Sequence, residues 1–99
     1  MPVLQIAHQV LDVDAWKDAF DRDPAGRERS GVRRYTIARA TDDPTYVTID
    51  LEFDSVDQAQ ALLATMRGIW QNVQGTRIRH PVARIVDVVE RHEYPAHQG

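Results

Sequence analysis

The hydrophobic pattern of the chain changes its period at Asp54–Ser55. Between Tyr46 and Phe53 apolar and polar residues alternate (YVTIDLEF), which is the pattern of a strand with one face on a core. After Ser55 the apolar residues recur every three or four positions, as in an amphipathic helix, and Ser55 with Gln58 has the spacing of a capping box. The helical stripe consists of Val56, Ala59, Leu62, Leu63, Met66 and Ile69 or Trp70. The sequence therefore predicts a strand that leads directly into a helix packed on its own sheet.

The first half of the chain follows the same rhythm of strand and helix. A first strand is expected over Val3–Val10, and a first helix begins after Asp12, whose side chain can cap it. A second strand is expected over Val32–Ala40. The turn residues Thr41-Asp42-Asp43-Pro44-Thr45 then connect this strand to the one that starts at Tyr46, as in a hairpin.

The C-terminal part contributes one more strand. The second helix is expected to end near Gly75, followed by a loop over Thr76–Pro81. The last strand, Val82–Glu90, carries aliphatic residues on both parities, which is typical of a strand covered on both sides. We therefore expect one domain over residues 1–92 and a flexible tail over residues 93–99.

The predicted order, β-α-β-β-α-β, is typical of the α+β ferredoxin-like fold, a four-stranded antiparallel sheet with two helices on one face. The other face would carry the polar residues of the third strand together with aliphatic residues of the last one. This surface is too apolar at one edge to face water and too polar at its centre to form a dry core. A second copy laid face to face would cover it, so we expect a homodimer, a dimeric α+β barrel enclosing a polar-centred hollow.

Composition narrows the class of protein. The chain has 99 residues, enough for one domain, and its net charge of −3 with a pI near 5.7 argues against a nucleic-acid-binding surface. The absence of cysteine excludes disulfides, thiol catalysis and zinc–thiolate sites. No apolar run is long enough to span a membrane, and the N-terminal residues are too polar for a secretory signal, so a cytoplasmic protein is expected. The arginines are densest at Arg27, Arg29, Arg33, Arg34 and Arg39, where a solvated face is favoured over an anion site.

Several motifs along the chain combine into a recognisable set. The first is the run His8-x-Val10-x-Asp12-x-x-x-Trp16-x-x-x-Phe20. The others are Gly31 before the second strand, Asp42-Asp43-Pro44 in the hairpin, and Leu51-Glu52-Phe53-Asp54-Ser55 leading into Ala59, Leu62 and Leu63. Together they resemble the small proteins of the dimeric α/β-barrel superfamily, relatives of the antibiotic biosynthesis monooxygenase domain. The resemblance extends from Val3 to Val89, and its motifs are mostly caps, staples and helix stripes.

This resemblance implies a ferredoxin-like protomer, a homodimer, and a pocket either between sheet and helices or inside the barrel. Characterised members of the superfamily include cofactor-independent oxygenases acting on polycyclic phenols, haem-degrading enzymes and small isomerases. The haem-degrading pattern of an Asn, a Trp and a haem-ligating His is not matched, since Asn72 and Trp70 lie together at the end of the second helix. We therefore expect no tightly bound cofactor.

His8 is the first candidate for acid–base chemistry. Alternation places it with Leu4 and Ile6 on the helix side of the first strand. A histidine titrates near neutral pH and can act as a general base at the mouth of a pocket. The competing interpretation is a partly buried histidine bonded to a backbone or carboxylate neighbour. The helix-side placement depends on parity alone, which a single bulge would reverse.

Asp50 is the second candidate base. It points to the same side of the third strand as Glu52, with the two Cα atoms about 7 Å apart. If that side is enclosed, Asp50 could remove a proton from a phenol or an activated C–H group. The competing interpretation is that both carboxylates are paired with Arg33, Arg34 or Arg39 of the neighbouring strand.

Five further residues are expected to bind the ligand. Tyr46, Thr48, Glu52 and Arg34 would line the hollow as hydrogen-bonding groups, and Trp70 would close one end of it. A Trp at helical spacing is, however, more often an ordinary core residue.

No metal site is expected from the remaining histidines. His92 and His97 have carboxylates nearby, but they lie in the predicted tail, where no scaffold holds ligands at fixed distances. His80 precedes Pro81 in a predicted loop, where a solvated side chain is favoured over a role in capping the cavity.

The sequence thus predicts a homodimer that binds a small organic ligand, such as an aromatic molecule, with Asp50 or His8 as the base. The predicted activity is that of a cofactor-independent monooxygenase or an isomerase. The alternative is a non-catalytic ligand-binding or structural dimer, and the two differ in whether a water-accessible pocket holds a carboxylate or histidine with free acceptor capacity.

Overall fold

Six secondary-structure elements alternate in the predicted order. In this computed structural model, which describes residues 1–73 and 78–96, they are β1 (Pro2–Val10), α1 (Val13–Asp21), β2 (Arg34–Arg39), β3 (Tyr46–Glu52), α2 (Val56–Val73) and β4 (Ile78–Asp87). The strands form one sheet in the order β2-β3-β1-β4, with every neighbouring pair antiparallel. The α+β ferredoxin-like fold predicted from the sequence is therefore confirmed.

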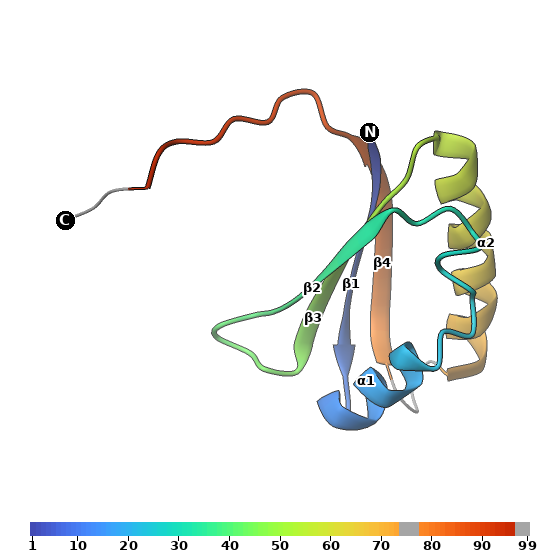
Figure 1. Cartoon of the computed structure of the whole chain (residues 1–99). Coiled ribbons are helices and arrows are strands. Elements are labelled where there is room, and N and C mark those ends of the chain that lie inside the picture. The colour runs from blue at the N-terminus through green and yellow to red at the C-terminus, as the bar shows by residue number, and fades with distance from the viewer. Residues whose placement is uncertain (74–77, 97–99) are drawn as a thin grey trace.

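The two helices cover the sheet unequally. Figure 1 shows α2 running along one face, while the shorter α1 crosses the end of the sheet where β1 stops. The segment between α1 and β2 returns alongside α2 on the same side. The helix side of the sheet is thus covered by α1, α2 and the segment between α1 and β2.

The core lies on the helix side of the sheet and follows the alternation of the strands. Leu4 and Ile6 of β1 lie opposite Leu51 and Ile49 of β3, and all four side chains are buried. Phe53 follows β3 and is fully buried. From the helices the core receives Trp16, Phe20, Ala59, Leu62, Leu63 and Trp70. The four residues from α2 belong to the apolar stripe predicted from the sequence.

Both helices begin at the predicted caps. The Asp12 carboxylate accepts a hydrogen bond from the backbone N–H of Ala15 at 3.1 Å. The Ser55 hydroxyl accepts one from the backbone N–H of Gln58 at 3.2 Å. Each bond satisfies a donor that the first helical turn leaves free, which fixes where the helix starts.

The last strand begins earlier than predicted, because β4 starts at Ile78 and passes through Pro81. Ala7 pairs with Val82 and Gln9 pairs with Arg79, so the two residues between them on β4 oppose the single residue His8. This irregularity is a β-bulge, and His80 within it has a positive φ of 53°. Proline is tolerated at such a bulge on an edge strand, and reading it as a loop residue was wrong. The strand also ends at Asp87 rather than Glu90, and the predicted C-cap Gly75 lies outside the described residues.

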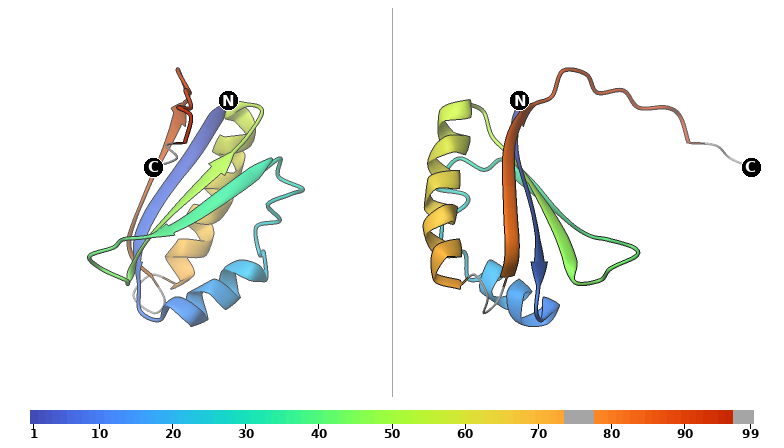
Figure 2. Two further views of the ribbon diagram at one scale, coloured as in Figure 1. Left: turned by 60° about the vertical axis from the view of Figure 1, so that its left-hand side comes forward. Right: turned by 180° about the vertical axis from the view of Figure 1, so that it is seen from behind.

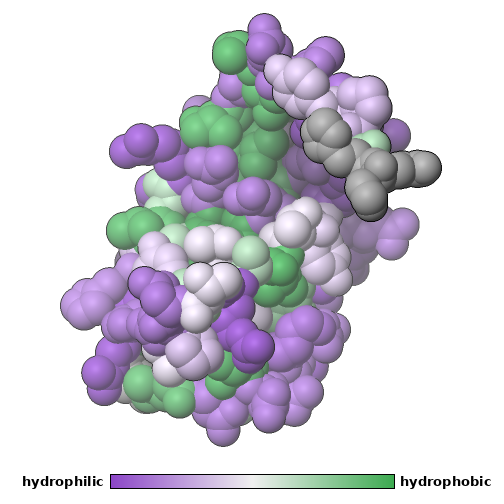
Figure 3. Space-filling view, turned by 90° about the vertical axis from the view of Figure 1, so that its left-hand side faces the viewer, coloured by the Kyte–Doolittle hydropathy of each residue, from purple (hydrophilic) through white to green (hydrophobic). Residues whose placement is uncertain are grey.

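The face of the sheet opposite the helices, the open face, remains uncovered in the single chain. Figure 3 shows hydrophobic and hydrophilic residues side by side on this side of the molecule. Val82 at one edge is 60% exposed. Residues 88–96, the C-terminal arm, contain no helix or strand and extend away from the sheet (Figures 1 and 2). Within the described ranges, no helix has the length and apolarity that crossing a membrane requires.

Candidate functional site

His8 occupies the helix side of β1, as its parity predicted. It is 2% exposed and is the single polar residue among the buried residues of the described chain. Strand alternation places it between Ile6 and Val10, and β3 presents Val47 opposite it. A titratable side chain is therefore held inside an otherwise apolar layer.

An aromatic wall extends from His8 along α1. The His8 and Trp16 rings meet edge to face, with centroids 5.6 Å apart and planes at 70°. The Trp16 and Phe20 rings, one helical turn apart, have centroids 5.4 Å apart. The cap at Asp12 sets the start of α1 and therefore positions this wall against the sheet.

A cavity of about 240 Å³ lies between the sheet and the helices, and His8 lines it. Its walls come from β1, β3, β4, both helices and the segment after α1. The lining residues are His8, Trp16, Ala19, Phe20, Arg22, Pro24, Ala25, Arg27, Ile49, Leu51, Leu62, Met66, Ile69, Trp70 and Ile78. Twelve of the fifteen are apolar, the exceptions being His8, Arg22 and Arg27, so the cavity is suited to an apolar molecule.

The His8 imidazole has free hydrogen-bonding capacity inside this site. Its Nδ1 atom is buried and has no hydrogen-bond partner among the described residues. Burial lowers the pKa of His8 below its ordinary value of 6.5, against a smaller opposing effect of the backbone at Gln9 and His8 itself. At neutral pH the ring is therefore uncharged and can accept a proton. The carboxylate neighbour of the competing interpretation is not found for His8 among the described residues.

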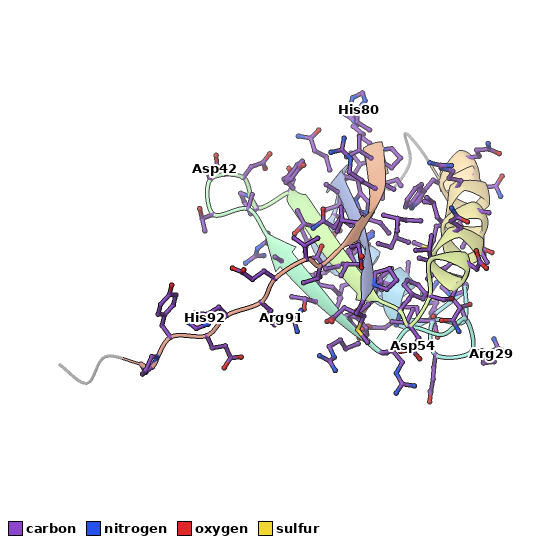
Figure 4. The ribbon with its side chains drawn as sticks, turned by 90° about the horizontal axis from the view of Figure 1, so that it is seen from above. Arg29, Asp42, Asp54, His80, Arg91 and His92 are labelled. Atoms are coloured by element: carbon purple, nitrogen blue, oxygen red, sulfur yellow. The ribbon has the colours of Figure 1, made fainter. Side chains whose placement is uncertain are left out.

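The bulge in β4 lies directly beside His8. Because two residues, His80 and Pro81, oppose His8 in the register, the ladder is interrupted at this one position. Bulges are frequent next to functional sites, where they redirect a side chain or end a pairing. Figure 4 shows His80 itself at the outer edge of the protein, pointing away from its body. His80 is exposed, so the suggestion that it caps the cavity is not supported by its position.

Asp50 and Thr48 lie on the opposite side of the sheet from His8. Asp50 pairs with Gln5 of β1 and Thr36 of β2, and its side chain is exposed on the open face. A shallow hollow of about 440 Å³ on that face is lined by Gln5, Ile6, Ala7, Thr48, Asp50, Val82, Ala83 and Arg84. Asp50 and His8 therefore belong to different sites, and the sheet separates them.

Glu52 and Arg34 also lie on the open face, but they are paired. Oε1 of Glu52 is 3.8 Å from Nη1 of Arg34 and 3.7 Å from Nη2 of Arg91 on the C-terminal arm. This agrees with the salt-bridge interpretation for Glu52, while no ion pair of Asp50 is found among the described residues. Tyr46 lies opposite Gln9, at the hairpin end of the same face, and is 37% exposed.

Of the predicted site residues, His8 and Trp70 line the cavity between sheet and helices, while Asp50 and Thr48 line the hollow on the open face. The segment that completes the cavity, Pro24 to Arg27, was not predicted to take part. Its sequence signal was the turn Asp23-Pro24-x-Gly26, which the charged residues around it obscured. Among the described residues no group of three metal-ligating side chains is found, and His97 lies outside them.

The comparisons with known proteins place this geometry in a structural context. No protein-family model matches the chain, and no curated protein matches it either. Solved structures do. A candidate antibiotic biosynthesis monooxygenase from Deinococcus radiodurans superposes with a TM-score of 0.74 at 11% identity, covering 97% of this chain and 100% of that one. SnoaB, a cofactor-independent oxygenase from Streptomyces nogalater, gives 0.72 at 15% identity, covering 96% and 97%.

A third structure bears on assembly. A dimeric ferredoxin-like protein from an uncultured marine organism superposes with a TM-score of 0.68 at 9% identity, covering 95% of this chain and 100% of that one. Identities this low speak for the fold and not for a shared activity. The chain therefore has the ferredoxin-like fold of these structures, which is the fold that its resemblance to the dimeric α/β-barrel superfamily implied.

Proposed function

We propose that this protein binds a small, flat, apolar organic molecule in the cavity between sheet and helices, with His8 as its acid–base group. The observation that carries the proposal is the unpaired Nδ1 of a buried histidine on the wall of an apolar cavity. An unsatisfied buried polar atom costs about 1–3 kcal/mol, so its retention favours a functional role. The cavity has about eight times the volume of a liquid water molecule, which suits one or two fused rings.

The chemistry proposed for this site is proton transfer. A neutral His8 can take a proton from a phenol or an activated C–H group, leaving a delocalised anion against the rings of Trp16 and Phe20. Return of the proton at another position isomerises the substrate. Reaction of the anion with dioxygen, as in cofactor-independent oxygenation, is the other outcome, and the structural likeness to SnoaB supports it. Neither reaction needs a tightly bound cofactor.

Ligand binding can be tested through the protein's own fluorescence. Both tryptophans of the chain, Trp16 and Trp70, line the cavity. A phenol or quinone that enters it is expected to change their emission saturably and to raise the melting temperature. Ala19→Phe, which fills the cavity from α1, should abolish both effects, whereas Ala64→Phe on an exposed position of α2 should not. Equal responses of the two variants would place the ligand elsewhere.

Catalysis needs a separate test with ligands identified in this way. His8→Gln is expected to abolish oxygen uptake or isomerisation, because glutamine cannot carry the proton. The matched control is His92→Gln on the C-terminal arm, where the side chain is exposed and far from the cavity (Figure 4). Full activity of His8→Gln would show that His8 is not the base. A wild type that binds these ligands without converting them would be a non-catalytic binding protein, the alternative predicted from the sequence.

We also propose that the open face forms a homodimer. Val82 and Tyr46 are large exposed residues on this face, and structures of the same fold are described as dimeric. In such a dimer the second copy would enclose Asp50 and Thr48, whose hollow is shallow in the single chain. Asp50 is therefore retained as a second candidate base, one that depends on the partner for its enclosure.

A further inference from the structure

Arg27 holds a guanidinium group at the boundary of the cavity. It lines the apolar cavity that contains His8, and it also lines a larger outer groove of about 840 Å³. Of the described residues, Arg27 alone lines both the cavity and the outer groove. The Arg27 side chain is 15% exposed. Its contact with the outer groove lets the guanidinium remain hydrated, which lowers the cost of placing a charge beside an apolar cavity.

The segment after α1 fixes Arg27 by its backbone. The Arg27 N–H donates to Oδ1 of Asp23 at 2.9 Å, and the Arg27 carbonyl accepts from the N–H of Val32 at 3.0 Å. Asp23 and Gly26 have φ values of 55° and 64°, which turn the chain sharply on both sides of Pro24. Aspartate and glycine are residues that tolerate this left-handed conformation. The position of Arg27 is therefore built into the turn.

The guanidinium lies over the Phe20 end of the aromatic wall. Its Nη1 donates to the backbone carbonyl of Phe20 at 2.7 Å, and its Cζ lies 3.8 Å from the centre of the Phe20 ring. The Tyr35 ring centre is 5.0 Å away. Its Nη2 and Nε have no acceptor among the described residues. Two donor groups therefore remain free on a side chain whose geometry is already fixed.

Asp23 only partly neutralises this charge. Its Oδ1 is 3.5 Å from Nη1 of Arg27, and the residue lines the outer groove but not the cavity. Along the wall, Trp16 contacts His8 at one end, and Phe20 contacts Arg27 at the other. An apolar molecule lying against these two rings would have the imidazole at one end and the guanidinium at the other.

We propose that Arg27 recognises an anionic oxygen of the ligand, so that the preferred ligands are flat apolar molecules bearing a carboxylate or phenolate. This inference rests on the proposed function of the cavity and specifies its ligand class. Guanidinium binds such oxygens by charge-assisted hydrogen bonds. Arg27 acts here as a positioning residue, which holds the anionic end and leaves the opposite end of the ligand beside His8.

The test uses two probes of nearly equal shape, 2-naphthoate and 2-naphthamide, titrated by calorimetry at neutral pH. The readout is the ratio of their affinities, which a purely structural role of Arg27 would not change. In Arg27→Met this ratio of acid to amide should fall about tenfold or more, because charge-assisted bonds are lost for the acid alone. Arg67→Met, at an exposed position of α2, should leave the ratio unchanged.

Asp23→Asn should change the acid-to-amide affinity ratio in the direction opposite to Arg27→Met. Asparagine keeps an oxygen for the Arg27 N–H and removes the competing charge, so the ratio should rise. If Arg27→Met does not fold, as judged by its thermal unfolding, Asp23→Asn and the charge-retaining Arg27→Lys decide the question by the same ratio.

The outcomes separate this inference from the proposed function. Binding of both probes to the wild type with a ratio that no Arg27 or Asp23 variant alters would overturn the role of Arg27 and preserve the cavity as a ligand site. An equal weakening of both probes in Arg27→Met would reduce Arg27 to a wall residue. Failure of the wild type to bind either probe would overturn the ligand class, and cavity binding itself would then be judged by the phenol and quinone titrations with Ala19→Phe.

Discussion

Burial of an uncharged His8 makes the stability of the protein depend on pH in a defined direction. The pKa of His8 is lowered below 6.5 in the folded protein, and in the unfolded chain it returns to that value. Between these two pKa values the unfolded state binds more protons than the folded state. Stability is therefore fully present above pH 6.5 and is lost as the pH falls from 6.5 to the folded pKa.

The size of this pH dependence follows from the binding of a single proton by His8. With at most one extra proton on the unfolded chain, the free energy of unfolding falls by at most about 1.4 kcal/mol per pH unit in this window. The pKa of His8 is lowered chiefly by burial of its ring against Trp16 and the apolar strand residues. No carboxylate is paired with His8 among the described residues to offset the loss.

Urea unfolding at pH 7.5, 6.5 and 5.5 measures this dependence, with His8→Phe as the reference because other groups also titrate. Phenylalanine keeps the ring contact with Trp16 and has no proton to bind. The protein concentration must be held constant, since dissociation of a dimer would contribute to the apparent stability. The wild type should lose more stability than His8→Phe as the pH falls. Parallel profiles, or a wild type that gains stability on acidification, would refute a buried, neutral His8.

Three further predictions concern other parts of the chain. Gly31→Ala should lower the free energy of unfolding by more than about 1 kcal/mol, measured by urea unfolding, because φ is +99° and a Cβ would lie 2.7 Å from the Gln58 side chain; an unchanged midpoint would contradict it. Light scattering should show a dimer at micromolar concentration and a shift toward monomer for Val82→Asp, since Val82 is 60% exposed on the open face; a wild-type monomer would remove the assembly. Asp50→Asn should leave ligand-induced changes in tryptophan emission intact, whereas their loss would move the ligand to the open face.

The sequence predicted the fold well because its signals are local. Caps at Asp12 and Ser55 and the alternation around Ile49 depend on neighbours within a few residues, and the structure has each where it was expected. The early start of β4 was missed because Pro81 ordinarily ends a strand, and only the pairing with β1 shows that a bulge accommodates it.

The candidate site could be predicted only in part. Parity placed His8 on the helix side and Asp50 on the opposite face, as observed, but it could not show which of the two faces holds an enclosed cavity in the single chain. Arg27 reaches the cavity through a turn built by Asp23, whose left-handed backbone depends on contacts within the folded segment. Such a conformation is not encoded in a hydrophobic pattern.

The central claim is that the cavity beside His8 is the ligand site. Its most direct test is an NMR titration of the labelled protein with 2-naphthol, following the His8 imidazole and the indoles of Trp16 and Trp70. These three signals, which come from separate elements around one cavity, should shift together and saturate at one affinity, while the methyl groups of Thr48 and Val82 on the open face stay in place. Saturable shifts confined to the open-face methyl groups would contradict the account.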